Sequence, residues 1–150
     1  MSATCNKNEG TVAVNSTNGN RNSTGDGQTI ALPAGLLVNT GDCLEIEAVC
    51  VTSGLSGTVD LIFGGTTLAT SGALVTTTAT IQFTGTVIRT GATTQIAMGC
   101  CYYAAGGSSP AYSTPAETLA NSITLKTAVA SLTAGSLDFR ILKCRVGRAS

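Results

Sequence analysis

The sequence predicts an all-β protein in which antiparallel strands form two sheets packed face to face. The 150 residues include 25 threonines and 18 glycines; threonine suits the pleated surface of a strand, and glycine marks turns. Short runs in which apolar and polar residues alternate recur between turn signals, and this alternation is the period of a half-buried strand. No helical pattern of about ten residues separates the runs. A chain of this length is expected to form one domain.

Alternation predicts about eight strands. The expected strands are residues 28–32, 42–52, 58–63, 66–70, 79–89, 93–103, 121–129 and 136–146. A proline follows the first strand, Gly64-Gly65 predicts a tight turn after the third, and Gly85 predicts a bulge in the fifth. The connection 104–120 is long enough to cross between two sheets. This length favours a β-sandwich of jelly-roll type over a single up-and-down barrel.

Two of these strands show which side chains the core receives. The side chains expected to point inward from 42–52 and 58–63 are Leu44, Ile46, Ala48, Cys50, Val59, Leu61 and Phe63. Cys43, Glu45 and Glu47 are expected on the opposite face of their strand.

The long connection contains a signal for the start of a helix. Thr114 is a candidate N-cap, Pro115 suits the first helical position, and Glu117 completes a Thr-x-x-Glu capping box. Beyond Asn121 the pattern alternates again. We therefore expect one helical turn at 114–117, which orders the connection, and a strand that begins at Asn121.

Residues 1–26 are expected to form an extended polar N-terminal arm, and residues 27–147 the jelly-roll domain. Asparagine is concentrated in the arm, which has too few apolar residues to bury, although 11–14 suits a short strand. The first ten residues have neither a basic start nor an apolar run, so no secretory signal is expected and synthesis in a cytosol is predicted. No run approaches the ~20 apolar residues of a membrane span.

Charge is sparse and balanced. Eight basic and eight acidic residues give a formal net charge of zero, and only 11% of residues are charged. This balance argues against direct binding to nucleic acid or to an acidic membrane. It also leaves little repulsion between copies of the chain, which is compatible with assembly.

The cysteines are expected to be structural. The chain has six of them: Cys5, Cys43, Cys50, Cys100, Cys101 and Cys144. There is no Cys-x-x-Cys and no histidine, so no metal site is expected. Most are expected to be reduced and buried. A disulfide between distant strands or between chains is the alternative.

No motif predicts an enzyme or a cofactor. The absence of histidine from the sequence excludes histidine-based triads. Glu45 and Glu47 lie on one strand face, roughly 7 Å apart, and paired carboxylates can hydrolyse glycosides. A solvent-facing strand produces the same pattern, and we prefer that interpretation. Asp60 and Asp138 are expected to be cross-strand partners of threonine or arginine, and Gly25-Asp26-Gly27 reads as a turn, not a phosphate loop.

Two groups of residues are candidates for binding a partner. The first is basic and holds half of the positive charge of the chain: Arg140, Lys143, Arg145 and Arg148. It is either a solvated strand end or a surface for an acidic partner. The second is aromatic, Tyr102 and Tyr103 with Tyr112, and would suit a sugar or a protein.

Five phrases in order resemble a jelly-roll module of tailed-bacteriophage structural proteins. They are a Leu-Pro-Ala start (32–34), a Gly-Asp strand opening (41–42), a Phe-Gly-Gly turn (63–65), an Arg-Thr-Gly turn (89–91) and a Thr-Pro-x-Glu-Thr-Leu crossover (114–119). The resemblance covers about residues 28–146. The six cysteines depart from the pattern of this family.

The resemblance implies a homotrimeric module on the outside of a virus particle, made in the host cytoplasm. The expected function is that of a head decoration (cement) protein, which binds the major capsid protein and stabilises its lattice. The alternative is a tail-fibre or receptor-binding module that contacts a host surface glycan or protein. The family implies no catalytic residues.

Overall fold

The computed structural model describes residues 11–15, 19–104 and 106–149. These residues form one antiparallel sheet and no helix, so the all-β prediction is confirmed. The strands are β1 (Thr11–Asn15), β2 (Gly19–Arg21), β3 (Gly25–Leu32), β4 (Cys43–Phe63), β5 (Thr66–Thr70), β6 (Leu74–Thr77), β7 (Thr80–Arg89), β8 (Gln95–Tyr103), β9 (Gly106–Ser113) and β10 (Ile123–Gly147).

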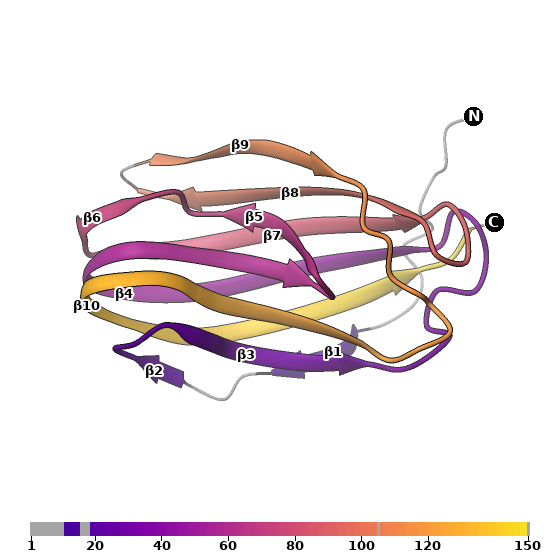
Figure 1. Cartoon of the computed structure of the whole chain (residues 1–150), viewed down its shortest axis with the longest axis horizontal. Coiled ribbons are helices and arrows are strands. Elements are labelled where there is room, and N and C mark those ends of the chain that lie inside the picture. Colours follow the sequence, from indigo (N-terminus) through magenta and orange to yellow (C-terminus); the bar gives the residue numbers. More distant parts are fainter. Residues whose placement is uncertain (1–10, 16–18, 105, 150) are drawn as a thin grey trace.

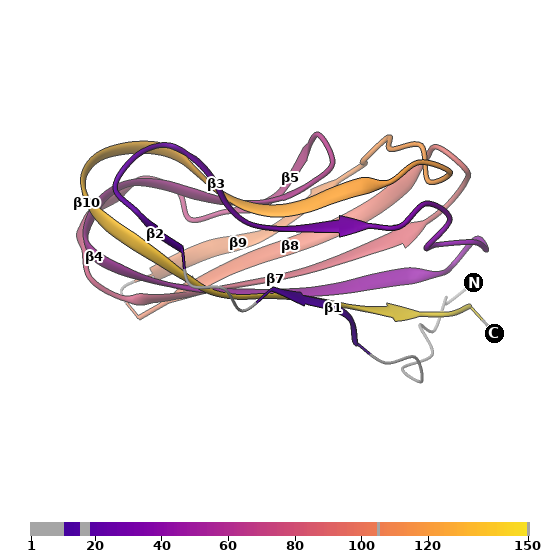
Figure 2. The same cartoon turned by 90° about the horizontal axis from the view of Figure 1, so that it is seen from below.

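Two long strands fold this sheet back on itself. β4 has 21 residues and β10 has 25, and they pair from Leu125↔Phe63 to Gly147↔Cys43. Both bend near their middle, where Gly54 and Gly135 have φ values of 58° and 81° and the pairing register shifts between Leu132 and Ser136. Bulges bend a strand and increase its twist, so the two strands curve together from one layer into the other (Figures 1 and 2).

The prediction of two separate sheets is therefore wrong, because each layer continues into the other through β4 and β10. The expected strands 42–52 and 58–63 are one strand, as are 121–129 and 136–146. The glycine-containing segments between them, interpreted as turns, are bends within continuous strands.

The pairing partners define the two layers. β3 and β5 pair with the beginning of β10 and the end of β4, and they form the first layer. β1, β7, β8 and β9 belong to the second layer, with the end of β10 and the beginning of β4. Figure 2 shows the layers edge-on.

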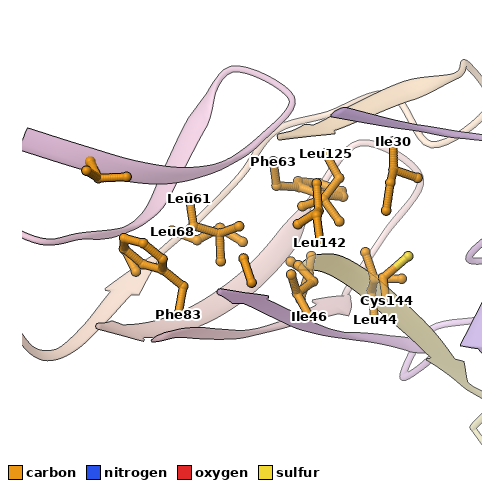
Figure 3. Close-up of a cluster of buried hydrophobic side chains, with 14 of the residues drawn as sticks. Ile30, Leu44, Ile46, Leu61, Phe63, Leu68, Phe83, Leu125, Leu142 and Cys144 are labelled. Carbon is orange, nitrogen blue, oxygen red and sulfur yellow. The ribbon is translucent and has the colours of Figure 1, made fainter. Parts of the chain in front are cut away.

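The core lies between the layers. Figure 3 shows Leu61, Phe63 and Leu125 pointing toward Phe83, Ile46 and other side chains of the opposite layer. All seven side chains predicted to point inward from β4 are at most 4% exposed, which confirms that prediction. Cys43, expected on the outer face, is 0% exposed and is disulfide-bonded.

Two glycines on neighbouring strands let the layers approach closely. Gly85 pairs with Ile46 and with Gly99, with no register shift on either side, so the predicted bulge is absent. A Cβ atom on Gly85 would lie 3.4 Å from methyl carbons of Leu61 and Leu68. A Cβ atom on Gly99 would lie 2.2 Å from the carbonyl oxygen of Leu68, because β5 passes directly over β8 there.

The loops at one end of the molecule are bound to one another. Gly35 N donates to Leu119 O (2.8 Å), Leu119 N donates to Ala92 O (3.1 Å), and the buried Gln95 side chain exchanges two hydrogen bonds with the backbone of Glu117. These bonds hold the loops 33–42, 90–94 and 114–122 together (Figure 2).

The helical turn predicted at 114–117 is absent. The Glu117 carboxylate accepts a hydrogen bond from Gly65 N at 2.6 Å and so satisfies the β4–β5 turn instead of a helix start. Part of the expected connection, Gly106–Ser113, is β9, which pairs with β8, and the next strand begins at Ile123, two residues later than predicted.

The described part of the predicted arm pairs with β10. β1, which includes the expected strand 11–14, runs beside Leu142–Arg145, and β2 runs beside Leu137–Phe139. β3 begins at Gly25, so the predicted boundary after residue 26 falls inside a strand. Residues 1–10 and 16–18 lie outside the described residues.

Candidate functional site

Exposed charged, polar and apolar side chains lie together on one face of the sheet. We call the solvent-facing side of β10, β4, β7, β8 and β9 in the second layer the outer face. Cross-strand pairing places Arg145 beside Glu45, Glu45 beside Thr86, Thr86 beside Met98, and Met98 beside Tyr112. This row changes from charged to polar to apolar across five strands.

The charged row lies at the β10–β4 end of the outer face. We define it as Glu45, Glu47, Lys143 and Arg145, which with Thr84 line a shallow hollow of about 220 Å³. Lys143 Nζ lies 2.7 Å from Glu47 Oε2, and both side chains are about one-third exposed. Such an exposed pair contributes ~0–1 kcal/mol to stability. The row carries both signs of charge.

The other predicted basic residues have carboxylate partners. Arg140 lies 2.7 Å from Asp138, at the bulge between Phe139 and Ile141. Arg148 follows β10 and binds the buried carboxylate of Asp42 at 3.0 Å. The structure thus brings Lys143 and Arg145 together on the outer face, and pairs three of the four predicted basic side chains with acids.

The apolar patch lies at the β8–β9 end. We define it as Thr86, Ile88, Ile96, Met98 and Tyr112, which border a second hollow of about 230 Å³. Met98 is 57% exposed and Tyr112 68% exposed. Tyr102 is also on this face and 52% exposed, whereas its neighbour Tyr103 packs against the core. The predicted Tyr102–Tyr103 pair is therefore split between the two sides of the sheet.

Sequence reasoning missed the apolar patch because β8 buries its smaller apolar residues. Ala97, Gly99 and Cys101 face the core, while Ile96 and Met98 face outward. The close passage of β5 over Gly99 leaves no room for large side chains on the inner side. The signal in the sequence was the alternation of large and small apolar residues from 96 to 99.

The carboxylates of the described residues are dispersed or partly paired. In the part of the chain that the structure describes, no three side chains of His, Cys, Asp or Glu gather in a group that could hold a metal ion. Glu45 and Glu47 line an open hollow, with Glu47 engaged by Lys143. Asp60 lies opposite Thr70 in the β4–β5 pair, but its buried Oδ1 has no hydrogen-bond partner among the described residues. The described residues also contain no helix that is long and apolar enough to cross a membrane.

Cys50, Cys100, Cys101 and Cys144 are buried; Cys5 lies outside the described residues. Burial, and then the neighbouring Cys100 thiol, raise the pKa of Cys101 to about 12. Burial, and then Cys101, also raise the pKa of Cys50. Only a thiolate is a good nucleophile, so these two thiols should be inert.

We expect iodoacetamide at about pH 8 to label Cys50 and Cys101 at least about 100-fold more slowly in the folded protein than in the chain unfolded by denaturant. Peptide mass spectrometry measures both rates site by site, and the unfolded chain is the control. Rapid labelling of either cysteine in the folded protein would contradict this inert interior.

In comparisons with known proteins, no family model, no curated protein and no solved structure matches this chain. The resemblance to bacteriophage structural modules therefore stays a prediction.

Proposed function

We propose that this chain is a structural protein of a tailed bacteriophage: a jelly-roll head decoration protein that binds, as a homotrimer, the outside of the major capsid lattice and stabilises it. The observation that carries the proposal is β8, which turns large apolar side chains to solvent on a rigid sheet face. Exposed apolar patches on such scaffolds mark protein contacts. The protein acts in the virion without cofactor, membrane or direct nucleic-acid contact.

The positions of the five phrases support a structural role. They lie at the loop-bearing end of the molecule, and hydrogen bonds connect several of them, such as Gly41 N to Arg89 O (2.8 Å) and Gly65 N to Glu117 Oε1 (2.6 Å). Their residues fix the loops that join the layers. The folding of the sheet into two facing layers supports the jelly-roll part of the proposal.

The proposed mechanism is mass action. A protein that binds only the intact lattice stabilises it by an amount that rises with the logarithm of its free concentration over its dissociation constant. Several modest contacts held by one trimer act together, because the second contact is made at a high effective concentration.

The test uses capsids assembled from the major capsid protein of the same genome and emptied of DNA. The purified protein should sediment with them and raise their melting temperature. Capsids without the protein are the control for melting, and the protein without capsids is the control for sedimentation. Absence of binding, with no change in capsid melting, would contradict the proposal.

One observation favours the second candidate, a receptor-binding module of a tail fibre. Tyr102 pairs with the exposed Gln82 on the outer face, and an aromatic ring beside an amide suits a glycan or a protein surface. Hydrogen bonding with Cys100 raises the pKa of Tyr102, so its hydroxyl stays neutral. Binding to host cells without affinity for capsids would support this candidate over the first.

A further inference from the structure

The apolar patch is built on a fixed framework. Ile96 faces Ile88 and Met98 faces Thr86 across the β7–β8 pair, which has no register shift, and Tyr112 faces Met98 from β9. The hollow between these side chains is bordered almost entirely by apolar atoms of the five patch residues and Ala97. A surface of this kind gains free energy when a matching surface covers it.

The partner must pack on this face and not extend the sheet. β9 is the last strand in the order β1-β10-β4-β7-β8-β9, so its outer edge has no strand partner among the described residues. Pro110 lies in the middle of β9 and has no N–H group, which interrupts strand addition. Side chains, not backbone hydrogen bonds, therefore carry the contact.

The contact must also extend beyond the apolar patch. A buried tyrosine removes about 150–250 Å² from solvent, whereas a stable contact buries about 800 Å² on each partner. Met98 and Tyr112 with their neighbours supply part of that area. The next residues along the outer face are Thr84 and the charged row, which would form a polar rim around an apolar centre.

The charged row restricts the charge that a partner surface can carry. It has two acidic and two basic side chains, so a partner of one sign, such as a nucleic acid, meets repulsion from half of it. A second copy of this chain carries equal numbers of acidic and basic residues, so its surface does not meet uniform repulsion from the row. Its net charge of zero also removes any long-range repulsion between copies.

We propose that the apolar patch, with the charged row as its rim, is the surface through which copies of this chain associate. This inference rests on the self-association in the proposed function, and is independent of capsid binding.

The test compares the full chain with the double variant Met98→Thr/Tyr112→Thr. Threonine keeps the strand preference and removes the large apolar side chains. Sedimentation equilibrium should show a wild-type oligomer, and its dissociation constant should rise about 100-fold or more in the variant, as for central contact residues. Val75→Thr is the matched control, because Val75 is 78% exposed on β6, away from the patch, and should leave association unchanged.

A second variant guards against misfolding. Thr86→Arg places a charge in the middle of the patch and should also weaken association, while circular dichroism shows that the sheet is retained. If both folded variants associate as tightly as the wild type, the apolar patch is not the interface, although the protein does self-associate. A wild-type chain that is a monomer at all concentrations would contradict both the proposed interface and the proposed self-association. Capsid binding, measured separately, tests the remaining part of the proposed function.

Discussion

Replacing Asp42 with alanine is expected to lower the free energy of unfolding by about 3–5 kcal/mol, because three backbone N–H groups and Arg148 lose a carboxylate acceptor. Asp42 is 0% exposed. Its carboxylate accepts hydrogen bonds from Val38 N (2.8 Å), Asn39 N (2.9 Å) and Ala149 N (2.9 Å), and from Arg148 Nη1 (3.0 Å). One side chain thus holds both the loop before β4 and the segment after β10.

The variant loses all four of these bonds at once. Three backbone N–H groups lose their acceptor, and Arg148, whose side chain is 34% exposed, loses its carboxylate. Each buried polar group left without a partner costs ~1–3 kcal/mol. Denaturant unfolding of both proteins measures the difference. Asp26→Ala is the matched control, because the Asp26–Lys126 pair is exposed and should contribute ~0–1 kcal/mol. Equal losses in the two variants would contradict the role of Asp42.

The same carboxylate predicts a pH dependence. Burial raises the pKa of Asp42, but the hydrogen bonds from Asn39, Ala149, Val38 and Arg148 together outweigh it, so the pKa lies below the ordinary value of 3.8. A depressed pKa contributes stability that is fully present above the unfolded value and is lost as pH falls through the folded value. The gap in stability between wild type and Asp42→Ala should therefore narrow below about pH 4. A gap that stays constant down to about pH 2 would contradict this assignment.

Gly99→Ala is expected to cost about 3 kcal/mol, the upper end for overpacking a core. The added methyl carbon would lie 2.2 Å from the Leu68 carbonyl oxygen and 3.1 Å from Ala69 Cβ. The obstruction is the backbone of β5, which cannot rotate away as a side chain does. The layers must separate locally to admit the methyl group.

Gly85→Ala provides the control, because Gly85 pairs directly with Gly99 and the same glycine-to-alanine change is made in a neighbouring strand. Its added methyl carbon would meet side-chain methyl groups at 3.4 Å, which is close to ordinary contact, so the change in stability should stay within about 1 kcal/mol. Thermal or denaturant unfolding of both variants measures the contrast. Equal effects would show that β5 does not press on β8 as the structure has it.

Strand positions and buried faces could be predicted from the sequence, because apolar and polar residues alternate along a strand and this alternation is visible in a short stretch of sequence. The alternation in β4 identified its core side chains, and Gly64-Gly65 identified the turn into β5. Continuity could not be predicted, because bends at Gly54 and Gly135 look like turns when the partner strand is unknown. The capping box at 114–117 failed for a related reason: a distant backbone amide, that of Gly65, takes the Glu117 carboxylate.

The candidate site was predicted only in part. Tyr102 and the basic residues of β10 were identified by composition, but their neighbours depend on strand pairing. Met98 lies near Tyr112 only because β9 follows β8 as a paired strand. Lys143 is paired with a carboxylate only because β4 and β10 are adjacent. Both contacts join residues that are far apart in the sequence, so a local sequence pattern cannot predict them.

We propose that this protein is a binding module whose outer face contacts other proteins on a capsid. The most direct measurement is a cryo-electron microscopy map of capsids saturated with the purified protein. We predict density for trimers on the outside of the shell, with the β8–β9 patch buried between copies. A bare shell at saturating protein concentration, or copies whose apolar patch faces only solvent, would contradict the account.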